Sequence, residues 1–323
     1  MSRALVAAAA LAACSVAFAA GPDTLRLNTF PNAKALPFHA GIARGIFAAH
    51  GVALELSFTE NSSAQREGLA AGRYDLVHAA VDNAVAMADA RADVVIVTGG
   101  DSGMNEFFVQ ADIGSFADLR GRTLVVDAPN TAYAIQAKKI LLKHGLSEGA
   151  DYRVVPVGRG ELRLKAMAQN KAYAAAILNL PFTLQAEQLG MKSLGNTVDM
   201  LGPYQANGAF ALRAWVRANG PLLERFIAGY VESLRWVRRP ENRAACVAIL
   251  MDRLSIPRDV AERTYLTLVD PARGFTPDAR FDAEGFRNLL ALRAEIEGKA
   301  SERSPESYVD LSYYGRALAT LGH

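Results

Sequence analysis

The feature that most constrains this chain is a strand-to-helix unit that occurs twice. In Gly68–Ala90 a glycine turn leads into a short apolar strand, and the polar pair Asp82-Asn83 then opens a helix. Leu164–Phe182 repeats this order later in the chain, with Asn179 at the end of its strand. In open α/β sheets, ligands lie beyond the carboxyl ends of the strands, where the free N–H groups of helix starts also point. The repeat predicts two lobes that face one cleft.

Strand and helix patterns alternate along most of the chain, which predicts an α/β fold with mostly parallel sheets. Two longer strand patterns, in residues 105–111 and 207–212, indicate crossings between the lobes near residues 106 and 207. We therefore expect one lobe to comprise residues 20–106 and 207–323, including a set of C-terminal helices. Residues 107–206 are expected to form the second lobe.

Two local signals in the first lobe make definite predictions. Apolar residues recur at helical spacing in Phe38–His50, and Gly51 follows, which predicts one helix with a glycine just beyond its end. Ser62 and Gln65 form an S-x-x-Q pattern, which predicts that Ser62 caps the next helix in a capping box.

The N-terminal residues predict an export signal. A short basic start precedes the apolar run Ala4–Val16, and the small residues Ala17 and Ala19 fit signal cleavage after Ala19. The sequence up to Cys14 also matches the acylation motif of lipoproteins, so lipidation of Cys14 is the alternative. Both routes predict an exported, periplasmic protein, and with cleavage after Ala19 the signal peptide comprises residues 1–19.

Composition and motif content narrow the function classes. The chain is 51% hydrophobic and 21% charged with a net charge of +2, which is typical of a globular protein and argues against a nucleic-acid partner. Outside the signal peptide Cys246 stands alone, so no intramolecular disulfide is expected. The five histidines show no HxxH spacing, and no GxSxG, P-loop or GxGxxG motif occurs. We predict no catalytic residue, no metal and no cofactor.

The residues that we expect to contact a ligand lie mainly in loops at the ends of predicted strands. They are Thr29, Phe30, Asn32, Phe38, Asn61, Ser62, Ser63, Asp82, Asn83, Asn130, Thr131, Arg159 and Asn179.

Hydroxyl groups at two predicted helix starts are suited to hold an oxyanion. Ser62-Ser63 and Asn130-Thr131 each combine side-chain donors with the free N–H groups of a helix start. Each pair can equally be a simple N-cap, and capping and ligand contact can coexist.

Charged and aromatic candidates point to a solute with both donor and acceptor groups. Arg159 lies between two glycines and can bind a carboxylate or sulfonate, or can be an exposed loop residue. Asp82 in a pocket would repel a plain anion and favour an amine or ring N–H group; otherwise it caps its own helix. Phe30, Phe38 and Phe182 can stack on a ligand or belong to the core.

Several segments carry a resemblance to a known family. The chain resembles periplasmic substrate-binding proteins of ABC importers, in particular the group for sulfonates, nitrate, taurine and thiamine-type pyrimidines. The segments that carry the resemblance are Pro37–Gly51 ending in GIFAAHG, Leu69–Leu76 with the pattern LxxGxxDL, Ser115–Val126, and the later stretches GAFALRAW, RWVRRPENR and Tyr308-Val309-Asp310.

The resemblance implies a type II periplasmic binding protein with two α/β lobes joined by two crossover strands. Such a protein closes on one small solute without catalysis and delivers it to an ABC permease at the membrane, here as a monomer. The Cys-rich motif of the pyrimidine-synthesising relatives is absent. Two alternatives stay open: an exported enzyme of the same fold acting on a pyrimidine-like substrate, and a solute sensor that presents its closed form to a receptor.

Overall fold

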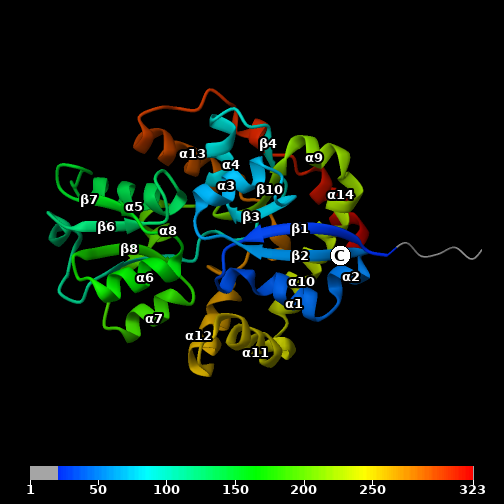
Figure 1. Ribbon diagram of the computed structural model, residues 1–323, viewed down its shortest axis with the longest axis horizontal. Coiled ribbons are helices and arrows are strands. Elements are labelled where there is room, and N and C mark those ends of the chain that lie inside the picture. Colours follow the sequence, from blue (N-terminus) through cyan, green and yellow to red (C-terminus); the bar gives the residue numbers. More distant parts are fainter. Residues whose placement is uncertain (1–20, 323) are drawn as a thin grey trace, which may run out of the picture.

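A computed structural model of the protein describes residues 21–322 (Figure 1). The predicted signal peptide, with Cys14 and Ala19, lies outside the described residues. Within the described residues, no helix has the length and apolar character needed to cross a membrane.

Two five-stranded sheets organise the described chain, as expected for an α/β protein. The first has the order β2-β1-β3-β10-β4, with strands β1 (Asp23–Thr29), β2 (Val52–Phe58), β3 (Leu76–Ala80), β4 (Val94–Ile96) and β10 (Asn207–Leu212). The second has the order β7-β6-β8-β5-β9, with strands β5 (Asn105–Val109), β6 (Thr123–Val126), β7 (Arg153–Pro156), β8 (Tyr173–Asn179) and β9 (Lys192–Asn196).

The sheets are mostly parallel, and each contains one central strand that runs the other way. β1 pairs in parallel with β2 and β3, and β6 pairs in parallel with β7 and β8. β10 is antiparallel to both β3 and β4, and β5 is antiparallel to both β8 and β9. The chain passes between the sheets in residues 97–104 and 202–206, which we call the crossing segments.

Helices cover both sheets and form a C-terminal group beside the first (Figure 1). α1 to α4 accompany the first sheet and α5 to α8 the second; their bounds are α1 (Leu36–Ala43), α2 (Ile46–Ala49), α3 (Ser62–Ala70), α4 (Asp82–Asp89), α5 (Ala132–Lys143), α6 (Gly160–Gln169), α7 (Phe182–Gln188) and α8 (Thr197–Leu201). The C-terminal group consists of α9 (Arg213–Ala218), α10 (Gly220–Arg238), α11 (Arg243–Leu254), α12 (Arg258–Leu268), α13 (Ala283–Glu297) and α14 (Ser312–Leu321).

The paired faces of β8, a central strand of the second sheet, explain its continuous apolar sequence. β8 has the sequence YAAAILN, and alternate residues serve opposite faces. Ala175 and Ile177 join the cluster under α5, whereas Ala176 and Leu178 join the cluster under α6 and α7. A strand covered on both faces needs a continuous apolar run, which is the pattern of parallel α/β sheets.

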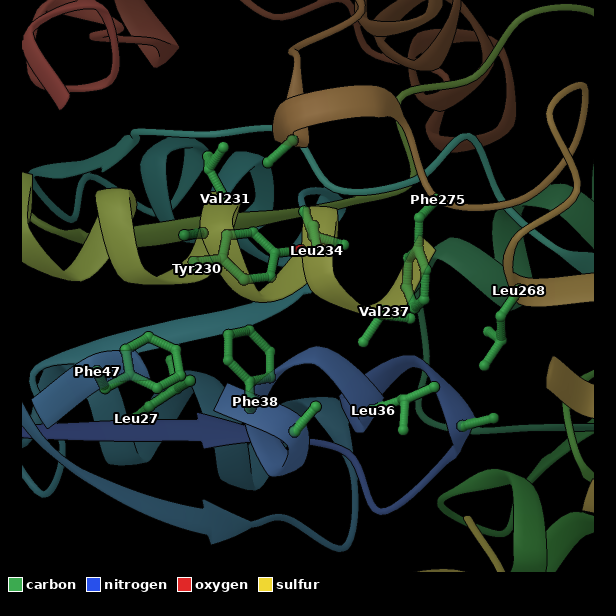
Figure 2. Packing of buried hydrophobic residues seen from close by; sticks show 14 of the residues in the cluster. Leu27, Leu36, Phe38, Phe47, Tyr230, Val231, Leu234, Val237, Leu268 and Phe275 are labelled. Carbon is green, nitrogen blue, oxygen red and sulfur yellow. The ribbon is translucent and has the colours of Figure 1, made fainter. Parts of the chain in front are cut away.

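α10 supplies the main apolar surface over the first sheet. Its residues Phe226, Tyr230 and Leu234 recur at helical spacing and are buried together with Phe38 of α1. Figure 2 shows the Phe38 and Tyr230 rings lying between α10 and α1, and their centroids are 4.9 Å apart. This packing anchors α1, which follows the loop after β1.

Two local predictions are wrong in detail. The single helix predicted for Phe38–His50 is divided into α1 and α2, because Gly45 adopts a left-handed conformation with a φ of 69° that ends the first helix. The cap of α3 is Asn61 rather than Ser62: the Asn61 side chain accepts from the Ala64 N–H at 2.8 Å. The Ser62 hydroxyl is therefore free to bond elsewhere.

β9 and α8 were not predicted, because their residues lack a clear apolar pattern. β9 has the sequence KSLGN and no fully buried residue, since it is the edge strand next to β5. Edge strands carry polar residues and are weakly marked in a sequence.

We expect Phe226→Ala to lower the free energy of unfolding by about 3–5 kcal/mol, because the ring is fully buried and stacks near Phe38 and Phe47. Urea unfolding of the purified protein measures this loss. Phe58→Ala is the matched control: Phe58 is 45% exposed, and its removal should cost less than about 1 kcal/mol. Equal losses in the two variants would contradict the assignment of the core.

Candidate functional site

A small cavity lies where the carboxyl ends of strands from both sheets meet. The space open to the centre of a water molecule is about 20 Å³, about enough for one ordered water. The first sheet and its loops contribute Thr29, Phe30, Asn32, Ser62, His78, Ala79, Ala80 and Asn207, and the second contributes Asp127, Thr131, Ala132 and Tyr133.

A hydrogen-bonded contact crosses the cleft at one side of this cavity. Ser62, at the start of α3, donates from its N–H to one Asp127 oxygen at 3.2 Å and from its hydroxyl to the other at 2.5 Å. Both side chains are almost fully buried. Asp127 directly follows β6, so this contact joins the two lobes through the strand-end loop of one and the helix start of the other.

A polar chain in the first lobe orients the Ser62 hydroxyl. The Asn83 amide donates to the Ser62 oxygen at 3.1 Å, so the hydroxyl proton is directed to Asp127. Asn83 in turn accepts from Arg66 at 3.0 Å and donates to Gln65 at 3.2 Å. Asn83 therefore does not line the cavity itself but orients Ser62, which does.

His78 lines the cavity from β3 and is held from behind. Its Nε2 atom lies 2.9 Å from the Tyr230 hydroxyl, and Phe38 packs edge-on against its ring. Burial lowers the pKa of His78 to about 4. His78 is thus a neutral hydrogen-bonding side chain at neutral pH.

A buried ion pair stands beside this group. Lys34 Nζ lies 2.9 Å from Asp101 Oδ1, and both side chains are almost inaccessible to solvent. Asp101 belongs to the first crossing segment and also accepts from the Gly103 N–H at 2.8 Å. The pair ties the loop after β1 to the crossing segment.

Tyr133 and its neighbours form the wall of the second lobe. The Asn179 amide donates to the Tyr133 hydroxyl at 2.7 Å, and the Arg163 guanidinium lies 4.8 Å from the centre of the Tyr133 ring. Arg163 is buried and donates to the carbonyls of Gly158 and Ile177. The side-chain Oδ1 of Asn179 is buried and has no hydrogen-bond partner among the described residues.

A groove of about 310 Å³ continues outward from the Ser62–Asp127 contact. Asn61 and Ser63 line it from the first lobe, and Asp127 forms part of its wall as well as part of the inner cavity. Arg159 stands at its edge, where it pairs with Glu60 across the cleft and with Glu161 on its own helix.

Asp82 lies outside the cavity in a buried cluster near the second crossing segment. Both Asp82 oxygens accept from the Tyr204 hydroxyl, at 3.0 and 2.9 Å, and Arg293 of α13 approaches to 3.6 Å. Burial raises the pKa of Asp82, although Arg293 and Tyr204 oppose the shift. Arg293 also donates to the Asn130 carbonyl at 3.4 Å, so the cluster touches the loop before α5.

The predicted site residues therefore fall into four groups. Thr29, Phe30, Asn32, Ser62 and Thr131 line the cavity; Asn61, Ser63 and Arg159 lie in or beside the outer groove; Asn83 and Asn179 support lining residues; and Phe38, Asp82 and Asn130 lie in the core or near the crossing segment.

The sequence reasoning did not select Asp127, His78, Tyr133 or Asn207, all of which line the cavity. Asp127 could have been found, because it stands at the end of a predicted strand, where ligand contacts are expected. His78 and Asn207 lie within strands, and only the strand order brings them to the cavity.

The two lobes, the antiparallel crossover strands and the cleft between strand ends define the fold of periplasmic solute-binding proteins. Residues 32–243 match the model of the family described as NMT1/THI5 like. The match spans more than half of the chain, so the protein belongs to this family. No curated protein matches the chain in sequence.

Solved structures share the fold over most of the chain. The alkanesulfonate-binding protein SsuA from Xanthomonas axonopodis pv. citri, bound to MOPS, is 18% identical with a TM-score of 0.73, covering 93% of this chain and 99% of its own. The periplasmic nitrate-binding protein NrtA from Synechocystis PCC 6803 is 14% identical with a TM-score of 0.71, covering 94% and 90%.

The same fold also occurs in an enzyme. The desulfurization enzyme DSZB is 16% identical with a TM-score of 0.62, covering 92% of this chain and 99% of its own. Among residues 21–322, no group of three or more His, Cys, Asp or Glu side chains is arranged to hold a metal ion. Function must therefore be argued from the cleft itself.

We expect the buried His78 to make the protein less stable in acid. Between pH 6.5 and about 4 the unfolded chain binds a proton at this position and the folded chain does not, so stability falls as the pH falls. At pH 5 the loss relative to pH 7.5 is about 2 kcal/mol. Urea unfolding of wild type and His78→Gln at both pH values measures it.

The contribution of His78 is the difference between wild type and His78→Gln in the free energy of unfolding lost on acidification. Burial also lowers the pKa of His39 to about 4, but His39 is present in both proteins and cancels. If wild type and His78→Gln lose equal stability on acidification, His78 is not buried in its neutral form.

Proposed function

We propose that this protein is the extracytoplasmic solute-binding component of an ABC import system. It closes its two lobes on a small polar solute, of sulfonate-, nitrate- or pyrimidine-like kind, and delivers the solute to a permease. The proposal includes the division into lobes at about residues 106 and 207 and a periplasmic, monomeric protein. Export by the predicted signal peptide is also part of it.

The observation that carries this proposal is a cavity to which both lobes contribute polar side chains. Asn32 and Asn207 reach it from the first lobe, and Tyr133 and Thr131 from the second. A solute that hydrogen-bonds to both walls stabilises the closed form relative to any more open form, because only the closed form offers all contacts at once. Ligand sites of this type are concave and carry a few placed polar groups.

Two side chains bear on the enzyme alternative. Cys246 is buried in the C-terminal helices, and burial raises the pKa of its thiol to about 12, which is unsuited to a nucleophile. His78 is held by Tyr230 and stays neutral. Binding without chemistry is therefore the better supported function, and an exported enzyme of the same fold is the second candidate.

A thermal-shift screen tests the proposal. The purified protein is heated with sulfonates, nitrate, amino-sulfonates, pyrimidines, amines and small aromatic acids. We expect one compound class to stabilise strongly, because a ligand at 100 times its Kd adds about 2.7 kcal/mol to the folded state. Turnover of a compound, together with the lack of any stabiliser, would contradict the proposal and favour the enzyme.

We expect Ser62→Ala to weaken binding of the compound found in that screen by about tenfold. The variant loses the hydroxyl bond from Ser62 to Asp127 across the cleft, and a buried hydrogen bond to a charged group contributes about 1.5–3 kcal/mol. Isothermal titration calorimetry measures the change. Ser147→Ala, on an exposed turn of the second lobe, is the control and should bind like wild type. Unchanged affinity in Ser62→Ala would place the solute away from the cleft contact.

A further inference from the structure

The lining of the cavity carries a negative charge. Among the lining residues within 21–322, Asp127 is the one acidic side chain, and none is a lysine or arginine. Burial keeps the one histidine, His78, neutral with a pKa of about 4. The remaining polar lining groups are hydroxyls and amides.

The nearest cations of the first lobe are committed to other partners. Lys34 is paired with Asp101 behind the cavity. Arg66 donates to Asn83 and Ser63, and it feels the charge of Asp127 without forming an ion pair with it. Neither side chain belongs to the lining.

The cations of the second lobe are committed as well. Arg163 donates to the carbonyls of Gly158 and Ile177 and lies over the Tyr133 ring. Its Nε finds no partner among the described residues, and it interacts with the charge of Asp127 without forming an ion pair with it. Arg159 is held at the outer edge by its two glutamate partners. No arginine or lysine of the described residues is therefore directed into the cavity.

Asp127 itself is 4% exposed and bonds to neutral Ser62. Hydrogen bonds from a neutral residue hold a carboxylate in place without neutralising it. Among the described residues Asp127 forms no ion pair, and its charge is offset only at longer range, by Arg66 and Arg163. A carboxylate in this position attracts a cation that enters the cleft and repels an anion. The ring of Phe30 lines the same cavity, and aromatic rings are favourable neighbours for organic cations.

We propose that the solute is a small organic cation with N–H donors, an ammonium or an amidinium, and that Asp127 is the residue that determines this specificity. The inference rests on the proposed solute-binding function and replaces the sulfonate- and nitrate-like solutes named there with a cationic solute. The chemistry that the sequence suggested for Asp82 thus belongs to Asp127. Simple oxyanions such as nitrate and alkanesulfonates bind weakly because their charge meets that of Asp127.

Pairs of probes with the same shape and opposite charge test this inference. Benzamidine and benzoate form one pair, acetamidine and acetate the other, and nitrate and ethanesulfonate represent simple oxyanions. Calorimetric titration of wild type should give a Kd for each amidine at least tenfold lower than for its carboxylate. Nitrate and ethanesulfonate should not compete.

Three variants assign the preference to Asp127. In Asp127→Asn the affinity for the amidine should fall at least tenfold and the preference over the carboxylate should vanish, whereas Asp127→Glu should keep it. Asp112→Asn removes a carboxylate from the exposed surface of the same lobe and should bind like wild type. Thermal melting of each variant verifies that it is folded, and Asp127→Glu decides if Asp127→Asn does not fold.

The outcomes separate this inference from the function on which it rests. Tighter binding of an oxyanion than of an amidine by wild type overturns the inference and leaves solute binding intact. The inference is also overturned if Asp127→Asn binds anions more tightly without losing amidine affinity. If the probes are too small to bind, the compound that stabilises the protein in the thermal screen is titrated instead. A cationic compound whose affinity falls tenfold in Asp127→Asn supports the inference, and an anionic compound overturns it. If no compound of either charge binds, the proposed function itself is contradicted.

Discussion

β5 and β10, the crossing strands that directly follow the two crossing segments, hold the geometry of the cleft, because each forms hydrogen bonds with strands on both of its sides. β10 lies between β3 and β4, and β5 lies between β8 and β9. The register of β10 places Asn207 opposite Ala80, at the end of β3, and so brings an amide to the cavity. Gly208 permits β10 to lie close to the first crossing segment, since a Cβ there would lie 2.3 Å from the Thr98 carbonyl oxygen. A register shift by one residue would move these groups to the wrong face of the sheet.

Buried ion pairs reinforce the same region. Lys34–Asp101 joins the loop after β1 to one crossing segment, and Arg293–Asp82 lies beside Tyr204 in the other. Burying two charges costs desolvation that their attraction only partly offsets, so such pairs are weak sources of stability. Their position where the chain passes between the lobes indicates a role in setting which loops meet across the cleft.

The fold is shared with proteins that are named for different solutes, and with an enzyme, so it does not decide what this chain binds. The side chains at the strand ends decide it. Here the cleft brings a carboxylate and neutral donors together, while the surrounding arginines and Lys34 are turned to other partners. Under the proposed function, the charge of the lining, more than the architecture, would set the class of solute.

The amino-acid sequence by itself determined the α/β class, most strand positions and the loops that form the cleft, because apolar periodicity, glycine turns and helix starts are encoded locally. It also indicated Thr29, Ser62 and Thr131, which the structure places at the end of β1 and at the starts of α3 and α5, where they line the cavity. Only the tertiary structure decided the partners of the polar side chains. Asp127 meets Ser62 from 65 positions away in the chain, and Asp82 turns to Tyr204 from 122 positions away. Such pairings depend on which loops the crossing strands bring face to face, and that is a long-range property that no local pattern contains.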